Sequence, residues 1–156
     1  RSSEIVAEWH RINEGAVYPV YSDVIPSLQT LKMKGYKMCA STNTLQPILD
    51  RRIIGNRLNT YLDFWLGGTP EIINKKDHKE PIKKRYDLNE TQFRASTVLV
   101  GDGYKDMDLA KIWGCKGVFV VRPHNSEEKA IKQGNADGIV HSLTELPQLL
   151  DEIFHV

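Results

Sequence analysis

The stretch TVLVGDGYKD, residues 97–106, decides the fold of this chain. Its first four residues are apolar or β-branched and predict a short buried strand. The glycines at 101 and 103 predict a sharp turn after that strand, and residues 107–113 have the spacing of a helix. A buried strand that leads through a turn into a helix is typical of a parallel sheet covered by helices.

The same alternation continues on both sides of this stretch. Further strands are expected at residues 36–41, 117–121 and 138–140, with a weaker one at 61–66. Helices are expected from about Ser22 or Asp23 to Gly35, with Asp23 as the cap, after a Thr42-Asn43-Thr44 cap, and at 81–88, 127–133 and 143–154. The pattern predicts an α/β fold, a Rossmann-like three-layer sandwich with a mainly parallel sheet.

Composition restricts the classes of function. The 156 residues carry 21 basic and 20 acidic side chains, a formal net charge of +1, and 40% are hydrophobic. These values predict one globular domain and argue against global disorder or a nucleic-acid partner. No run of 18 apolar residues occurs, so no membrane partner is expected.

The cysteines and histidines indicate structural roles. Cys39 and Cys115 lie in or beside apolar runs, which indicates reduced, buried thiols in a cytoplasmic protein. The five histidines are scattered along the chain, so we interpret them as surface or cap residues rather than zinc ligands.

Polar residues follow the predicted strands at their carboxyl ends, where α/β proteins place their chemistry. Thr42 and Asp102 each end a strand, and Asp106 follows Asp102 by four residues. Lys79 precedes a helix, 102 − 79 = 23 residues before Asp102, and Lys76 is a competing choice. A hydroxyl, an ammonium and two carboxylates suit a phosphoryl group with Mg²⁺. Taken singly, these residues also fit a helix cap, a solvated charge and a turn.

The order and spacing of these residues resemble the motifs of the haloacid dehalogenase superfamily of phosphohydrolases. GYKMCASTN, residues 35–43, resembles the second motif, an apolar strand ending in Ser or Thr. KEPI, residues 79–82, resembles the third motif, a lysine that opens a helix. VLVGDGYKD, residues 98–106, followed by Gly114, resembles the fourth and is the most specific of the three. The match extends from about Tyr18 to the C-terminus.

The resemblance implies a Mg²⁺-dependent hydrolase that acts on a small phosphate monoester through an aspartyl-phosphate. Thr42 and Asn43 would then bind the phosphoryl group, and Lys79 would neutralise its charge and orient the nucleophile. Asp102 would ligate Mg²⁺. Asp106 would either join the metal ligands or fix Lys79.

One motif of the family is missing: the Asp-x-Asp that ends its first, central strand and supplies the nucleophile. We therefore expect the strand and its aspartate upstream of Arg1 or in a complementary chain, and the chain alone to be inactive. Residues 1–17 would be the end of a helical cap or linker, and 18–156 the α/β core. The alternative is a non-catalytic domain of the same fold that binds a phosphorylated ligand or a protein partner.

Overall fold

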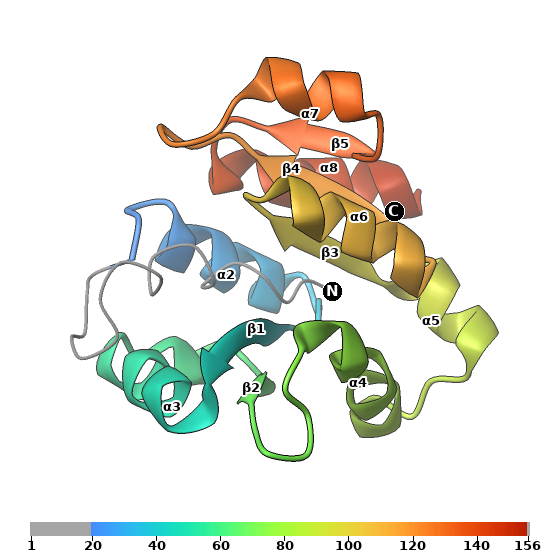
Figure 1. The fold of residues 1–156 in the computed structure, drawn as a ribbon. Coiled ribbons are helices and arrows are strands. Elements are labelled where there is room, and N and C mark those ends of the chain that lie inside the picture. The colour runs from blue at the N-terminus through green and yellow to red at the C-terminus, as the bar shows by residue number, and fades with distance from the viewer. Residues whose placement is uncertain (1–19, 156) are drawn as a thin grey trace.

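The structure is a computed structural model that describes residues 20–155 (Figure 1). Its helices are α2 (Val24–Met33), α3 (Gln46–Gly55), α4 (Lys79–Arg85), α5 (Glu90–Ser96), α6 (Tyr104–Trp113), α7 (Glu127–Gln133) and α8 (Leu146–Phe154). Its strands are β1 (Cys39–Leu45), β2 (Phe64–Gly68), β3 (Val98–Gly101), β4 (Lys116–Val120) and β5 (Gly138–Val140). Short 3₁₀ turns lie at η1 (Leu58–Thr60), η2 (Lys75–His78) and η3 (Leu143–Glu145).

All the strand pairs are parallel, which confirms the predicted α/β class. β1 pairs with β2, and β3, β4 and β5 form a second group in that order. Within residues 20–155, no pairing joins β1 to β3, so the strands form two separate sheets. Figure 1 shows β1 and β2 together with α3 and α4, apart from β3–β5.

The strands divide the core into two clusters because successive side chains of a strand point to opposite faces. Val98 and Val100 belong to the first cluster, which also contains residues of α2 and α8. Leu99, between them, belongs to the second cluster with residues of α5 and α6. Helices therefore cover both faces of the strands, as a three-layer α/β sandwich requires.

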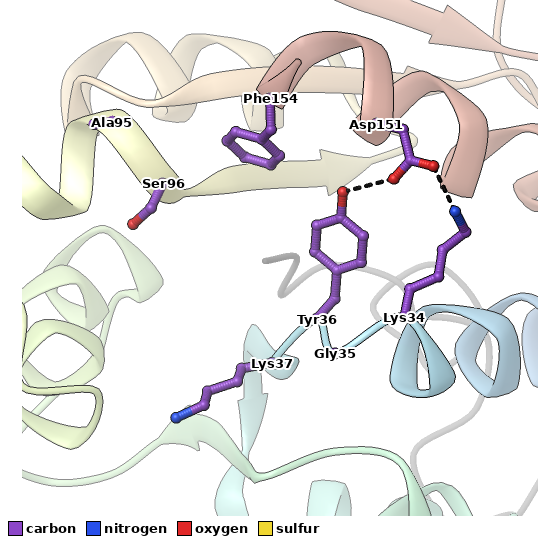
Figure 2. Close-up of a pocket in the computed structure, with 8 residues that line it drawn as sticks. All are labelled: Lys34, Gly35, Tyr36, Lys37, Ala95, Ser96, Asp151 and Phe154. Carbon is purple, nitrogen blue, oxygen red and sulfur yellow. Dashed lines mark hydrogen bonds and ion pairs between the residues drawn. The ribbon is translucent and has the colours of Figure 1, made fainter. Parts of the chain in front are cut away.

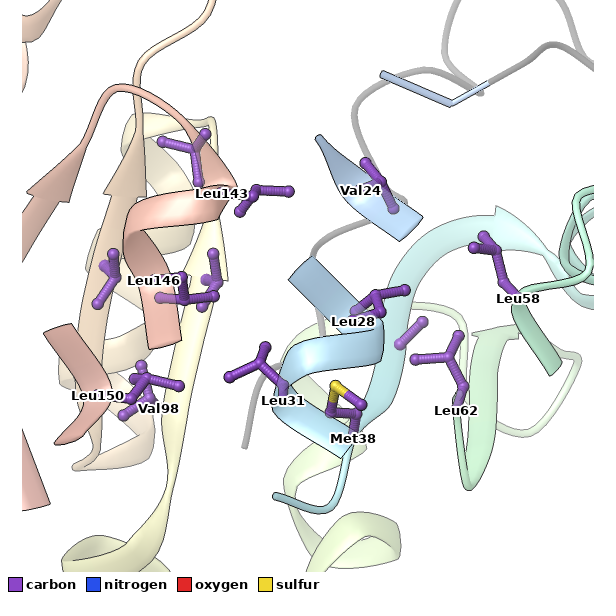
Figure 3. Close-up of a cluster of buried hydrophobic side chains, with 14 of the residues drawn as sticks. Val24, Leu28, Leu31, Met38, Leu58, Leu62, Val98, Leu143, Leu146 and Leu150 are labelled. Atoms are coloured by element: carbon purple, nitrogen blue, oxygen red, sulfur yellow. The ribbon is translucent and has the colours of Figure 1, made fainter. Parts of the chain in front are cut away.

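Helix α2 joins the two groups of strands. Its residues Val24, Leu28 and Leu31 are almost fully buried in the first cluster. Figure 3 shows Leu28 near Met38 and Leu62 on one side, and Leu31 facing the side that carries Val98, Leu146 and Leu150. The α2 side chains thus belong to one continuous core with both groups of strands.

Several local predictions were wrong. β1 begins at Cys39 and continues through Leu45, so the expected Thr42-Asn43-Thr44 cap is strand instead, and α3 has no side-chain cap. β2 lies at 64–68 rather than 61–66, and helix α5 was not expected at all. Asp23 does not cap α2 through its side chain but pairs with Arg122.

The expected cap or linker at residues 1–17 lies outside the described residues. Among the helices between residues 20 and 155, none combines the length and apolar character needed to cross a bilayer.

Candidate active site

The carboxyl end of β1 carries two of the predicted phosphate-binding residues. Thr42 is buried, and its Oγ1 accepts a hydrogen bond from the Thr44 amide at 3.2 Å. The Asn43 side-chain Oδ1 accepts a hydrogen bond from the Lys75 amide at 2.7 Å. Asn43 therefore ties the end of β1 to the η2 turn, 32 residues later.

Asp102 directly follows β3 and is held by the loop after β4. Its carboxylate is 4% exposed, and Oδ2 lies 2.6 Å from His124 Nε2. The Asn125 side-chain amide donates to the Asp102 carbonyl oxygen at 2.9 Å and to the Val120 carbonyl oxygen at 2.9 Å. This loop fixes both the backbone and the carboxylate of Asp102.

Asp106 lies in the first turn of α6 and points back toward the end of β3. Its Oδ2 accepts a hydrogen bond from the Gly103 amide at 3.0 Å. Its approach depends on Gly101, because a Cβ at that position would lie 2.4 Å from Asp106 Oδ2 and 2.7 Å from Asp106 Cβ. The glycine that ends β3 is therefore required by close contact with this carboxylate.

The lysine that reaches the carboxylates is Lys75. Its Nζ lies 2.5 Å from Asp106 Oδ1, with side-chain exposures of 17% and 8%. Lys79 instead pairs with Glu90 at 2.8 Å and lies over the Phe93 ring. Lys76 contributes its carbonyl oxygen, which accepts a hydrogen bond from the Trp113 indole N–H at 2.9 Å.

Two of these contacts link the two groups of strands. Asn43 at the end of β1 binds the backbone of Lys75, and the Lys75 ammonium pairs with Asp106 beyond the end of β3. Thr42 lies in the second half of β1, and Asp102 directly follows β3. The predicted hydroxyl and carboxylates thus lie at the carboxyl ends of β1 and β3, joined by a lysine from η2, while Lys79 lies elsewhere.

The described residues 20–155 contain no group of three or more His, Cys, Asp or Glu side chains arranged to hold a metal ion. The donor set nevertheless fits Mg²⁺, which typically takes one or two carboxylates and completes its shell with water and phosphate oxygens. Asp102, which directly follows β3, is the candidate ligand. The oxygens of Asp106 contact Lys75 and the Gly103 amide, so Asp106 is the residue that holds the lysine.

A cavity of about 400 Å³ lies at the other ends of the strands (Figure 2). It is lined by residues that precede β1, including Lys34 and Tyr36, and by Ser96 just before β3. Figure 2 shows the Tyr36 hydroxyl and the Lys34 ammonium both pointing at Asp151. Because α/β sites form at the carboxyl ends of strands, we do not assign the chemistry to this cavity.

Sequence reasoning missed three residues of the candidate site. Lys75 was one lysine of a basic run, and His124 and His78 were interpreted as surface or cap residues. His78 is instead 1% exposed and bonded to β1 and β2. His124 follows β4 by four residues, and its place after a parallel strand was the available signal.

Comparison with known proteins agrees with this architecture. Residues 2–120 match the model of the family described as haloacid dehalogenase-like hydrolase. No curated protein matches the sequence significantly.

Solved structures share the fold. A haloacid dehalogenase-like family hydrolase from Streptococcus pneumoniae superposes with a TM-score of 0.71 at 17% identity, over 84% of this chain and 60% of that one. A predicted phosphoglycolate phosphatase from Haemophilus somnus gives 0.72 at 20% identity, over 90% and 61%. A dehalogenase gives 0.67 at 24% identity, over 83% and 55%.

The chain thus spans between 55% and 61% of the length of these three structures. The family match covers well over half of the sequence and includes both strands that carry the candidate site. The parallel strands, the carboxylates after β3 and this match lead to one assignment: the chain belongs to the haloacid dehalogenase-like hydrolase family.

Proposed function

We propose that this protein is a Mg²⁺-dependent phosphohydrolase that acts on a small phosphate monoester through an aspartyl-phosphate. The observation that carries the proposal is the Lys75–Asp106 pair at the carboxyl ends of β1 and β3. A partly buried lysine between a hydroxyl-bearing strand and two carboxylates supplies what a transferring phosphoryl group needs, namely positive charge and hydrogen-bond donors.

The chemical group of each site residue suggests its role. Thr42 would donate its hydroxyl hydrogen to a phosphate oxygen, and Asn43 would hold the η2 turn and offer its amide to the phosphate. Lys75 would neutralise phosphate charge, the role expected of Lys79 from the motif. Asp106 would hold Lys75, which is one of the two roles expected for it.

Asp102 would hold Mg²⁺, with His124 as the hydrogen-bond partner of its other oxygen. When bound, Mg²⁺ would neutralise phosphate oxygens and so stabilise the charge of the transition state.

The nucleophile has a natural position between β1 and β3. The residues Cys39–Thr42 and Val98–Gly101 are buried, and β1 and β3 belong to two different sheets within residues 20–155. A parallel strand inserted between β1 and β3 would join the two sheets into one. We place the nucleophilic aspartate at the end of such a strand, in a segment preceding the described residues or in a complementary chain.

The reaction then balances in two steps. The aspartate oxygen attacks phosphorus, the ester P–O bond breaks, and the leaving alcohol oxygen takes a proton. Water next attacks the aspartyl-phosphate, which releases inorganic phosphate and restores the carboxylate. Cys115 is a buried free thiol and Cys39 is buried in β1, which supports action in a reducing compartment such as the cytoplasm.

The test uses the full-length protein as its source makes it, with a panel of phosphate monoesters. We expect release of inorganic phosphate that requires Mg²⁺ and stops with EDTA, and we expect Asp102→Ala to abolish Mg²⁺ binding measured by calorimetry. Phosphate-ester binding without turnover would replace the proposal with the non-catalytic alternative. Unchanged Mg²⁺ affinity in the variant would refute the metal assignment, and halide release from a 2-haloacid would make the enzyme a dehalogenase.

A further inference from the structure

His78 is a buried imidazole with both ring nitrogens bonded. It is 1% exposed and ends the η2 turn. Its Nδ1 lies 2.7 Å from Ser41 Oγ on β1, and its Nε2 lies 3.1 Å from the Gly67 carbonyl oxygen on β2. One side chain therefore connects η2 to both strands of the first sheet.

The two contacts fix the tautomer of this ring. A carbonyl oxygen only accepts, so Nε2 carries the hydrogen, and the neutral ring then accepts the Ser41 hydroxyl hydrogen at Nδ1. Burial lowers the pKa of His78, and the nearby Lys75 lowers it further, while Asp77 and the bond to Gly67 act in the opposite direction. The neutral imidazole adds no second positive charge beside the Lys75 ammonium.

The η2 turn is held at three points by three different elements. Asn43 Oδ1 binds the Lys75 amide, the Trp113 indole binds the Lys76 carbonyl oxygen, and His78 binds β1 and β2. The Lys75 ammonium reaches Asp106 from this turn. Of the three anchors, only His78 lies in η2 itself and has its whole side chain buried against the sheet.

We propose that His78 is a positioning residue, which holds η2 so that the Lys75 ammonium stays on Asp106. The catalytic use of Lys75 rests on the proposed function, but the positioning does not, because it concerns contacts present without substrate. Ser41 takes part in this positioning, because its hydroxyl donates the hydrogen bond that sets the orientation of the His78 ring.

The experiment measures the reactivity of each lysine toward a limiting amount of acetic anhydride, read by peptide mass spectrometry, without substrate. The variants are Ser41→Ala, which removes one bond, and His78→Leu, which removes both. We expect Lys75 to be labelled roughly three- to tenfold faster in His78→Leu, the factor that corresponds to a typical net hydrogen bond, and less so in Ser41→Ala. Lys79 and Lys83, paired with Glu90, are internal controls and should not change.

Leu150→Ala is the matched control variant. It creates a cavity in the first core cluster, on α8, and should destabilise the fold without loosening η2 selectively. Unchanged Lys75 labelling in folded Ser41→Ala and His78→Leu would overturn the proposal, as would an equal rise in Leu150→Ala. If His78→Leu does not fold, Lys75 labelling in Ser41→Ala and in His78→Asn tests the proposal instead. The asparagine keeps a polar group near the position of Nδ1. A protein without phosphatase activity would still give this labelling result, so the two proposals fail separately.

Discussion

Replacing Lys75 with methionine tests the candidate site most directly, because methionine keeps much of the length and removes the charge. The Lys75 ammonium lies 2.5 Å from Asp106 Oδ1 and its side chain is 17% exposed. A unit charge about 4 Å from a phosphoryl oxygen contributes about 4 kcal/mol at an effective dielectric constant of about 20. Partial solvent exposure reduces this value, so we expect kcat/KM to fall by roughly 10²- to 10³-fold.

The assay is phosphate release by the full-length protein with Mg²⁺ in excess, and Lys79→Met is the matched control. Lys79 pairs with Glu90, which also binds Lys83 and Arg94. Loss of one of three cations around an exposed carboxylate should change kcat/KM by less than roughly threefold. A large loss in Lys79→Met with normal activity in Lys75→Met would refute the assignment and return the role to Lys79.

Stability must be measured beside activity, because Lys75→Met removes the cation beside Asp106 Oδ1 and leaves the hydrogen bond from the Gly103 amide to Oδ2. Breaking a buried pair costs about 3–5 kcal/mol, and the exposure of Lys75 should lower this to about 2 kcal/mol. The double variant Lys75→Met, Asp106→Asn removes the unpaired charge. It should recover stability in thermal unfolding while activity stays low, whereas recovery of activity would show that the loss was only structural.

Three further outcomes follow from buried groups. Arg122→Met breaks a pair with Asp23 at 2.8 and 3.1 Å and should cost about 3 kcal/mol in urea unfolding at pH 7. Burial alone would raise the pKa of Asp23, but Arg122 and neighbouring donors outweigh burial and lower that pKa below 3.8. The difference in unfolding free energy between the unmodified protein and Arg122→Met should therefore shrink as the pH falls below about 4. A constant difference down to the lowest pH at which the protein folds would contradict this. Gly101→Ala should destabilise by about 1–3 kcal/mol through its clash with Asp106, and an unchanged melting temperature would contradict the close contact. Burial raises the pKa of Cys115 to about 11, so a thiol reagent should modify it only on unfolding, and immediate reaction in the native protein would contradict its burial.

The sequence predicted the alternation of strands and helices because burial on both faces leaves near-continuous apolar runs, as in Val98–Val100. It failed where pairing overrides local preference. The polar run from Ser41 to Thr44 contains Asn43, a residue depleted in strands, and was interpreted as a cap. It lies in β1 because Ser41 pairs with Leu66 and, after an irregularity in the register, Leu45 pairs with Gly68. Such pairing is a tertiary property and leaves no local signal.

Helix α5 was missed although its signal was present. Asn89 accepts a hydrogen bond from the Gln92 amide, and the Gln92 side chain accepts from the Asn89 amide, which forms a capping box. Asn followed three residues later by Gln is a recognised start of a helix. The sequence therefore contained a signal for the start of α5, and the prediction from sequence did not use it.

The choice between Lys75 and Lys79 depends on backbone geometry that the sequence does not display. Residues four apart on an α-helix are separated by about 40° around the axis and share a face. η2 is a 3₁₀ turn with about three residues per turn, so three steps complete a circle and a fourth step of the same size carries Lys79 about 120° away from Lys75. This rotation agrees with their different partners, Asp106 and Glu90. On the proposed role of His78, its contacts with β1 and β2 hold the end of η2 and so determine which lysine faces the carboxylates.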